Sequence, residues 1–514
     1  MDDSAPPPAP PNGRHEPLWL ATSDRTDCDP LDGELHVDTA VVGGGIAGVT
    51  TAAKLDAADQ SVALLERDRI LVGTTGHTTA KVTSLHGLVY DELVDTFGVD
   101  RARQYAAANQ AAIEDIARTV ERRDIDCGFG RAPAYTYVAP GGDRAAVRAE
   151  VNAARELGLP AAYVEDCDLP YEIDAAVRFD DQAYFHPRRY LLELARGVAG
   201  NGSHVFEETT VEGIDDGAPC RVSTDRGTVT ADTVVVASHF PVEDDALYFS
   251  RLRPKRSYIV AARLAGEQPD GLYYDPEEPY FSVRPHATDD SLVLIGGQNH
   301  RTGDGDSTEE RYRALERRAR EHFDVESIEY RWATQDFVSV DTVPFIGKAA
   351  PQVSNVYVAT GFGGWGMTNG TAAGRLLADE ILGRESDRAE VFDPNRFEPL
   401  ASKSEFLSHN TKTMRHYFED YLGSRPSLDP LALDPGEAGV YEFDDDPVAV
   451  YRDEDGEVHA RSAVCPHMGC LVDWNDGEKS WDCPCHGSRF GVDGEVLDTP
   501  AVDGLEDVSL PDGS

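Results

Sequence analysis

Cysteines and histidines close to the C-terminus form the densest group of chemically reactive side chains in this chain. They fall in two short stretches, each with two cysteines and one histidine: Cys465, His467 and Cys470, then Cys483, Cys485 and His486. Thiolate sulfur and imidazole nitrogen bind zinc, or iron in an iron–sulfur cluster. The chain has eight cysteines, and the other four are scattered along it. This uneven distribution predicts a metal centre rather than a disulfide framework.

The pattern C-x-H followed by C-x-x-H, with a further cysteine in each stretch, fits a [2Fe–2S] cluster with mixed ligands better than a zinc site. With these motifs, residues 434–514 resemble Rieske domains. The resemblance implies that Cys465 and Cys483 bind one iron. It implies that His467 and His486 bind the other iron.

The same resemblance makes predictions for the neighbours of the cluster. It implies a disulfide between Cys470 and Cys485, an unusual bond in a reducing cytoplasm. Ser488 matches the family's serine that donates a hydrogen bond towards the cluster, whereas Phe490 stands where high-potential members have a tyrosine. We therefore expect a reduction potential below the top of the Rieske range of about −150 to +300 mV. No 2-His-1-carboxylate iron site is evident in the sequence, which disfavours an aromatic-ring hydroxylase.

A second group of residues, near the N-terminus, is suited to binding a dinucleotide. Residues 37–42 read as a buried strand, and residues 46–58 read as a helix after a glycine-rich turn. Gly43, Gly45 and Gly48 occupy the glycine positions of G-x-G-x-x-G. They permit a tight turn, close approach of the backbone to a pyrophosphate, and close packing of helix on strand. The helix N-terminus would direct its amides and positive dipole end at the phosphate.

A second strand and an acidic residue complete this unit. Residues 61–65 are apolar, and Glu66 follows them at roughly the 20-residue spacing expected for a ribose-binding acid. G-x-G-x-x-G alone is a weak signal, but the complete strand–helix–strand–acid unit predicts a dinucleotide site. The following loop, residues 73–81, is rich in hydroxyl groups and small residues. This composition fits either a plain polar loop or a loop that wraps a phosphate or the edge of a flavin. The place of the loop after a Rossmann strand favours the cofactor-binding reading.

The closing part of the cofactor domain lies far along the chain, which favours FAD over NAD. Residues 355–361 read as a strand, and the glycine-rich run 362–368 leads into a helix whose N-terminus would stabilise the negative charge of a reduced flavin. Here the sequence resembles the D-amino-acid oxidase/glycine oxidase superfamily, over residues 36–395. The resemblance rests on the N-terminal motif, on residues 332–347 with Gln335, Asp341, Pro344 and Gly347, and on residues 357–370.

The resemblance implies that FAD is bound non-covalently. No cysteine stands near the closing motif, where some relatives attach flavin by a thioether. The cofactor contacts carried over by the resemblance are Gly43, Gly45, Gly48, Glu66, Arg67, Thr75, Thr78, Thr79, Lys81, Val211, Gly361, Gly366, Met367 and Thr368.

The expected fold class is an α/β Rossmann-type FAD-binding domain with an inserted α+β substrate domain, plus a C-terminal all-β Rieske domain. Helical stretches such as residues 101–123 and short strands lie between residues 91 and 184, and alternating strands lie between 251 and 330; both interrupt the βαβ order and indicate the insertion. Within the FAD-binding domain, residues 222–230 read as a hairpin and residues 231–238 as a buried parallel strand. The expected boundaries are: 1–34, a flexible acidic and proline-rich extension; 35–90, 185–250 and 331–395, the FAD-binding domain; 91–184 and 251–330, the substrate domain; 396–433, a connector with a helix near 406–421; and 434–514, the Rieske domain.

The charge and hydropathy of the chain restrict its partners and location. Asp and Glu number 93 against 47 Lys and Arg, and the net charge is −46. This excess argues against nucleic acid and anionic membranes as partners, and it resembles proteins of salt-loving microbes such as halophilic archaea. No signal peptide and no apolar run long enough to span a membrane is visible, so we expect a soluble cytoplasmic protein.

Together the two centres predict a substrate dehydrogenase. An amine or amino acid would give a hydride to flavin N5, and the cluster would pass electrons to an unknown protein or quinone acceptor. Tyr258, Arg284 and Trp365 are candidate substrate contacts, with Arg284 suited to a carboxylate, although each is equally readable as a packing or surface residue. Two alternatives remain: a reductase that receives electrons from a donor protein, and a non-catalytic redox sensor or electron carrier.

Overall fold

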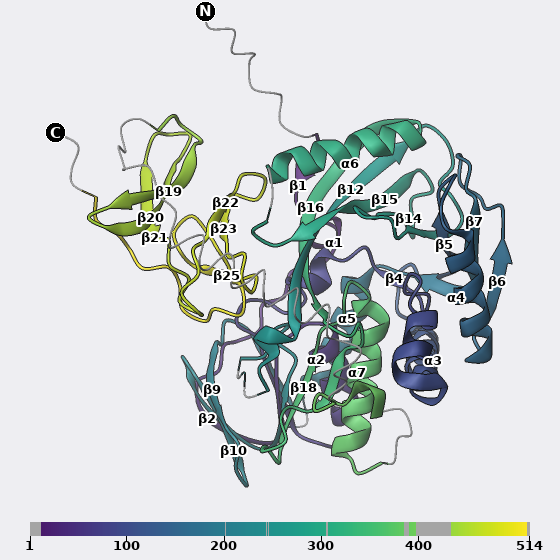
Figure 1. The fold of residues 1–514 in the computed structure, drawn as a ribbon. Coiled ribbons are helices and arrows are strands. Elements are labelled where there is room, and N and C mark those ends of the chain that lie inside the picture. The colour runs from purple at the N-terminus through teal and green to yellow at the C-terminus, as the bar shows by residue number, and fades with distance from the viewer. Residues whose placement is uncertain are drawn as a thin grey trace, which may run out of the picture.

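Two large β-sheets and two small ones organise the chain in a computed structural model, which describes residues 12–200, 202–242, 244, 246–304, 307–384, 390–396 and 433–510. The two large sheets form the main body, and a small β-domain made by the last residues lies beside it (Figure 1). The predicted connector helix near residues 406–421 lies outside the described residues.

The eight-stranded sheet is the Rossmann-type half of the body. The strand order is β17-β18-β11-β2-β3-β8, and β9 and β10 continue from β11 as an antiparallel extension. Pairs among β18, β11, β2, β3 and β8 are parallel. The strand bounds are β2 Gly33–Val42, β3 Val62–Leu65, β8 His204–Phe206, β9 Val211–Asp215, β10 Cys220–Thr224, β11 Gly227–Val236, β17 Phe345–Lys348 and β18 Val356–Thr360.

Three helices pack side by side on one face of this sheet, and an apolar cluster with Val222, Phe240 and Phe337 covers the other. Its central strands are therefore buried on both faces and read as continuous apolar runs. The bounds of the helices are α2 Ile46–Asp56, α5 Pro187–Val198 and α7 Gly366–Ile381. Helix α5 begins with Pro187 at its first turn, and the His186 side chain accepts a hydrogen bond from the Arg189 amide as its N-cap.

The ten-stranded sheet forms the other half, in the order β1-β16-β12-β15-β14-β13-β5-β7-β4, with β6 paired to β7. Its pairs are antiparallel except for β1 with β16 and β13 with β5. The strand bounds are β1 Arg14–His15, β4 Lys81–Val82, β5 Gly130–Val138, β6 Ala161–Val164, β7 Ala175–Tyr184, β12 Leu252–Leu264, β13 Leu272–Asp275, β14 Phe281–Pro285, β15 Leu292–Arg301 and β16 Val325–Ser339. Helices α3 Tyr90–Arg123, α4 Arg144–Glu156 and α6 Thr308–His322 accompany this sheet.

Local elements differ from expectation in three places. Helix α3 begins at Tyr90, well before the predicted start at Arg101, because Gly98, with φ +79°, kinks it and interrupts the helical pattern. Strand β16 reaches Ser339, beyond the expected boundary of the substrate domain at residue 330. The predicted hairpin and the following buried strand are joined, since β11 runs without a break over Gly227–Val236.

The expectation of a flexible extension over residues 1–34 is wrong for the part that the structure describes, from Asn12 onward. Helix α1, Leu18–Ala21, buries Leu18 and Trp19, and the Trp19 indole donates a hydrogen bond to the Thr78 carbonyl oxygen at 2.7 Å. A buried indole with a partner for its N–H holds this segment on the body.

The C-terminal β-domain has two small antiparallel sheets. One contains β19 Ala438–Phe443, β20 Asp446–Arg452 and β21 Val458–Ser462, and the other contains β22 Asp473–Asn475, β23 Ser480–Asp482, β24 Arg489–Phe490 and β25 Val496–Asp498. Its core includes the cysteines of both metal-type stretches and the fully buried ring of Phe490. Short 3₁₀ turns elsewhere are η1 Thr74–His77, η2 Tyr248–Ser250 and η3 Glu390–Phe392.

Within the described ranges, no helix combines the length and apolar character needed to cross a bilayer.

Candidate functional site

The glycine-rich turn follows β2 and positions the start of α2. Gly43 has φ +105°, and a Cβ there would lie 2.5 Å from the Ala237 carbonyl oxygen. A Cβ at Gly48 would lie 1.9 Å from the Gly43 carbonyl oxygen, so the helix can approach the turn only with glycine here. A Cβ at Gly45 would meet no atom closer than the Thr75 hydroxyl oxygen, at 3.4 Å, so this side of the turn is accessible.

The residues next to this turn hold its amides in place. The Glu66 carboxylate, at the end of β3, accepts a hydrogen bond from the Gly44 amide at 2.7 Å, and burial raises its pKa. The Thr75 hydroxyl accepts one from the Ile46 amide at 3.0 Å. These two bonds fix the backbone of the turn at the start of α2, and in folds of this kind a phosphate group binds at the helix N-terminus.

A cavity of about 550 Å³ opens in front of the turn and continues between the two large sheets. Its volume lies within the range of small-molecule and cofactor sites. Thirteen of the residues predicted to contact cofactor or substrate line it: Gly43, Gly45, Glu66, Arg67, Thr75, Thr78, Thr79, Lys81, Val211, Gly361, Trp365, Gly366 and Met367.

Two predicted cofactor residues lie behind this lining. Gly48 spaces α2 from the turn. The Thr368 hydroxyl donates to the Thr83 carbonyl oxygen at 2.9 Å and lies 3.0 Å from His86 Nε2. Burial lowers the pKa of His86 to about 3, so this imidazole is neutral and its ring stacks on Trp365 with centroids 4.9 Å apart. Thr368 and His86 therefore support the lining residue Trp365.

Aromatic rings from the ten-stranded sheet form the opposite wall of the cavity. The Tyr274 ring meets the Trp365 ring edge to face, with centroids 5.3 Å apart. It lies tilted against the Tyr280 ring, with centroids 5.4 Å apart. The Lys255 ammonium lies 5.2 Å from the centre of the Tyr280 ring, and it pairs with the exposed Glu278 carboxylate at 3.4 Å. The wall thus combines apolar ring faces with one cation that an incoming carboxylate could reach.

Two predicted substrate contacts, Tyr258 and Arg284, are not among the described residues that line this cavity. The Arg284 guanidinium is fully buried and donates to the backbone oxygens of Ala80, Phe185 and Pro285. The Tyr258 hydroxyl lies 3.0 Å from His300 Nε2. The positions of Tyr258 and Arg284 therefore match the alternative interpretation, in which both are packing residues.

Lys81 is a second cation at the cavity. Burial, together with the neighbouring charge of Arg284, lowers its pKa to about 7. A group with a pKa near 7 can give or take a proton at neutral pH.

The two cysteine–histidine stretches form matching loops in the C-terminal domain. The Cys465 amide donates to the Cys470 carbonyl oxygen and the Cys483 amide to the Ser488 carbonyl oxygen, both at 2.8 Å. The Cys465 thiol is hydrogen-bonded to Cys483, which lowers the pKa of Cys465 to about 7. The rings of His467 and His486 meet edge to face with centroids 5.0 Å apart. Two thiols face each other and two imidazoles face each other, which is the donor set of a mixed-ligand [2Fe–2S] cluster.

A disulfide between Cys470 and Cys485, the predicted pair, joins the loops with a Cα–Cα distance of 6.4 Å. These two sulfurs lie within 4.8 Å of Cys483, so the three cysteines alone form a compact sulfur group. Disulfide sulfurs are not thiolates, however, so Cys470 and Cys485 do not supply the ligands of this site.

The second of these loops is clamped to the main body. The Arg301 guanidinium donates to the Pro484 and Cys485 carbonyl oxygens at 3.0 and 2.7 Å. The Gln335 amide nitrogen donates to the Gly487 carbonyl oxygen at 2.7 Å. A Cβ at Gly487, where φ is +83°, would lie 2.4 Å from Pro254, so glycine permits this close contact. Residues 481–490 are all buried.

The histidine rings also face the body. His467 meets Phe240 edge to face at 6.3 Å, and His486 meets Phe249 at 5.5 Å. The loop of His467 is the more open of the two, since Pro466 and Met468 are both exposed.

A second group of contacts joins the β-domain to the ten-stranded sheet. Glu478 accepts a hydrogen bond from the Tyr312 hydroxyl at 2.7 Å and pairs with the buried Arg256 guanidinium at 3.4 Å. The Asp476 carboxylate accepts from the Thr308 and Glu309 amides at 2.7 and 3.1 Å, which caps the N-terminus of α6. The β-domain also completes the cavity wall through Glu478, Arg489, Leu497, Asp498, Thr499 and Val502.

Several of these residues escape prediction from sequence. Arg301, Glu478 and Asp476 carry no motif, and their role arises only where the two parts of the chain meet. Tyr274 and Tyr280 stand in strand-like stretches in which a tyrosine is an ordinary packing residue. Gln335 belongs to a stretch that resembles a family motif, but that motif does not predict its hydrogen bond to Gly487.

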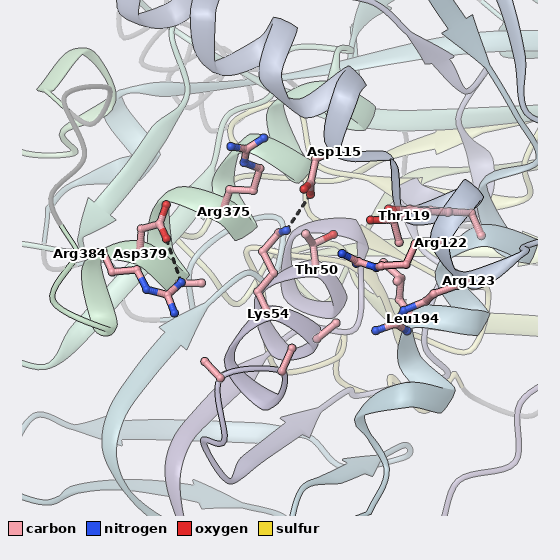
Figure 2. Close-up of a pocket in the computed structure, with 15 residues that line it drawn as sticks. Thr50, Lys54, Asp115, Thr119, Arg122, Arg123, Leu194, Arg375, Asp379 and Arg384 are labelled. Atoms are coloured by element: carbon pink, nitrogen blue, oxygen red, sulfur yellow. Dashed lines mark hydrogen bonds and ion pairs between the residues drawn. The ribbon is translucent and has the colours of Figure 1, made fainter. Parts of the chain in front are cut away.

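A smaller cavity of about 340 Å³ lies on the other side of α2 (Figure 2). Lys54 points to Asp115, with their charged atoms 2.7 Å apart, and Arg384 pairs with Asp379 at 3.4 Å. Lys54 stands in the last turn of α2, as Arg122 does in α3. Cations in these positions stabilise the negative ends of helices, so their gathering needs no bound anion.

Comparisons with known proteins agree with this geometry. A family model described as FAD dependent oxidoreductase matches residues 38–380, and a Rieske [2Fe-2S] domain model matches residues 428–509. YhfW, a Rieske 2Fe-2S iron–sulfur protein of Bacillus subtilis, is 35% identical over 498 residues, which cover 96% of this chain and 98% of that protein. The gamma-glutamylputrescine oxidoreductase of Escherichia coli is 25% identical over 379 residues, with 71% and 88% covered.

Among solved structures, glycine oxidase from Geobacillus kaustophilus is similar with a TM-score of 0.59 and 19% identity, covering 71% of this chain and 99% of that one. At this identity the likeness concerns the fold.

Proposed function

The chain belongs to the FAD dependent oxidoreductase family and carries a Rieske [2Fe-2S] domain, and from this premise we propose that it dehydrogenates an amine or amino acid and passes the electrons through the cluster to an external acceptor. FAD takes two electrons from a substrate C–H bond and can release them singly, whereas a Rieske cluster carries one electron. The class of substrate is supported by the gamma-glutamylputrescine oxidoreductase relative.

One observation carries this proposal. A single cavity is bounded by the glycine turn, by the ten-stranded sheet and by the cluster-bearing domain. The cavity residues fit FAD because glycines at positions 43 and 48 allow the turn and helix to approach closely, and the paired thiols and imidazoles fit the cluster. A substrate in the cavity and the cluster would therefore use the same flavin.

The side chains of the cavity suggest how a substrate is held. The rings of Trp365 and Tyr274 offer flat faces that orient an apolar group near the cofactor. Lys255 is the cation best placed to bind a substrate carboxylate, in place of Arg284, which does not line the cavity and whose Nε and Nη1 donate to backbone oxygens. Lys81, with its pKa near 7, can exchange a proton at the cavity wall.

An anaerobic screen of amines and amino acids tests the proposal, read by flavin absorbance and by the EPR signal of the reduced cluster. We expect at least one compound to bleach the flavin and to produce the cluster signal. If a broad panel leaves the flavin oxidised while a reduced electron-carrier protein bleaches it, the reverse direction holds and the dehydrogenase proposal is wrong.

A matched pair of lysine variants tests the role of Lys255. For a carboxylate-bearing substrate, Lys255→Met should raise KM about 10- to 100-fold with kcat little changed, because one charged hydrogen bond is lost. Lys54→Met makes the same chemical change at the smaller cavity of Figure 2 and should leave KM unchanged. Equal KM values in both variants would exclude Lys255 as the carboxylate partner.

We also propose that the enzyme works in the cytoplasm. Fractionation of the source cells, with the flavin and cluster signals followed together, tests this.

A further inference from the structure

Building on the proposed function, we propose that Gln335 is the positioning residue that fixes the cluster-binding loop to the wall of the cofactor cavity. Electrons then pass between cavity and cluster on the side of His486, and the loop of His467 is left to face the external acceptor.

Gln335 contacts three separate parts of the chain at once. Its side-chain amide nitrogen donates to the Gly487 carbonyl oxygen at 2.7 Å, and its side-chain oxygen accepts from the Thr302 hydroxyl at 2.7 Å. Its backbone oxygen accepts from the Thr74 hydroxyl, in the loop that lines the cavity, at 2.9 Å. Gln335 itself lines the cavity and is only 3% exposed. A single residue thus links the cavity to the cluster-binding loop.

The chemistry of the amide explains why glutamine suits this position. The Thr302 hydroxyl donates to the amide oxygen, so the NH₂ end must face the Gly487 carbonyl. A carboxylate would place acceptor against acceptor, and an apolar side chain would leave both partners buried and unpaired. Both Thr302 and Gln335 are buried, so water cannot replace these bonds freely.

The partner residue, Gly487, belongs to the loop that holds two of the cluster ligands. It directly follows His486, and its amide donates to the Cys483 carbonyl oxygen at 3.0 Å. A Cβ at this position would lie 3.2 Å from the Gln335 amide nitrogen as well as against Pro254, so the loop approaches the cavity wall as closely as a backbone can. Moving Gln335 therefore moves the loop that carries Cys483 and His486.

The other cluster loop is the more exposed of the two. Pro466 and Met468, on either side of His467, are exposed, and Met468 has 48% of its surface accessible. Oxidation of one substrate molecule delivers two electrons, so the contact through Gln335 is used twice per turnover. A one-electron acceptor must remove one electron after each use, and the open loop is where it can approach.

The test is made on the loaded full-length protein with Gln335→Met, which keeps the length of the side chain and removes its amide. Photoreduction of the flavin with EDTA as electron donor bypasses the unidentified substrate, so this experiment can succeed even if the substrate class is wrong. The rate at which the EPR signal of the reduced cluster appears is then measured, together with amide hydrogen exchange of residues 483–488. Gln268→Met is the matched control, because Gln268 also bonds backbone atoms through both ends of its amide, at His286.

We expect Gln335→Met to slow cluster reduction by about tenfold and to speed exchange of the loop by a similar factor, which is the population change that one buried hydrogen bond produces. Cluster content and the flavin spectrum should stay as in the wild type. Gln268→Met should change neither rate.

Cluster reduction and loop exchange at wild-type values in Gln335→Met would overturn the proposal. If Gln335→Met loses its cluster, Thr302→Val decides, because it removes only the hydroxyl that orients the amide. Cluster reduction that is slower in Thr302→Val than in the wild type supports the proposal. Cluster reduction at the wild-type rate in Thr302→Val contradicts it.

Discussion

The ion pair between Glu478 and Arg256 offers the sharpest test of how the β-domain is attached to the body. Arg256 has 1% of its side chain exposed and Glu478 has 14%, and their charged atoms lie 3.4 Å apart. Both residues also line the cofactor cavity. The perturbation is Glu478→Gln, which keeps the shape of the side chain and leaves the guanidinium buried without its counter-charge.

Two independent routes give the size of the effect. Removing one partner of a buried ion pair costs about 3–5 kcal/mol. The pKa of Glu478 gives the second route: burial would raise it, but the hydrogen bond with His15 and the charge of Arg256 lower it from 4.5 to about 2. At about 1.4 kcal/mol per pH unit, that change corresponds to about 3 kcal/mol of stability.

The sign of the pH dependence follows from the lowered pKa. The carboxylate stabilises the folded chain fully above pH 4.5, its unfolded value, and this contribution is lost as the pH falls from 4.5 towards 2. Glu478→Gln should therefore unfold at lower urea concentration at pH 7, and it should lack this part of the acid dependence.

The assay is urea unfolding of the loaded protein between pH 7 and pH 3, followed by the visible absorbance of the cluster and by the fluorescence of the flavin. Glu506→Gln, at an exposed glutamate of the same domain, is the matched control and should be neutral. A Glu478→Gln protein with the wild-type midpoint at pH 7 and the wild-type acid dependence would refute the reasoning.

Three further predictions concern the cluster and the surface. Phe490→Tyr places a hydroxyl donor in the fully buried core beside the thiols, so the reduction potential of the cluster should rise; a redox titration that finds it no higher than in the wild type contradicts this. Replacing Cys470 and Cys485 together by serine removes a cross-link between residues 15 apart, which should cost about 3 kcal/mol and speed bleaching of the cluster in urea; unchanged bleaching would show that the disulfide carries little stability. The net charge of −46 predicts that the melting temperature rises between about 0.1 and 1 M KCl, as the screening length falls from about 10 to 3 Å, and a flat or falling profile would be the contrary result.

What the sequence predicts best is chemistry set by short spacing. The glycine turn can be predicted because Gly43 and Gly48 permit close packing within one strand–turn–helix unit, whose residues are neighbours in the sequence. The two cysteine–histidine loops can be predicted for the same reason, because the residues of each loop are close in sequence. The disulfide between Cys470 and Cys485 followed from a resemblance and is present in the fold.

What the sequence does not predict depends on surfaces that meet only in the folded chain. Arg301 is far in sequence from the Pro484 and Cys485 carbonyls that it bonds, and a charge by itself does not indicate a partner at such a distance. Arg284 illustrates the converse error: an arginine suited to a carboxylate instead donates to three backbone oxygens inside the body. Trp19 follows a proline-rich stretch that resembles a solvated tail, but the apolar run at residues 17–20 is able to dock on the body, and the Trp19 indole is buried there.

The unequal burial of the two cluster loops has a kinetic consequence. One loop is sealed against the cavity wall, and the other has Pro466 and Met468 open to the surroundings. An oxidising partner can therefore dock while the reducing compound still occupies its own chamber, and neither has to leave before the other arrives. Because the two half-reactions occur at separate sites and share only the electrons held by the enzyme, double-reciprocal plots should run parallel, and neither compound should inhibit by competing with the other.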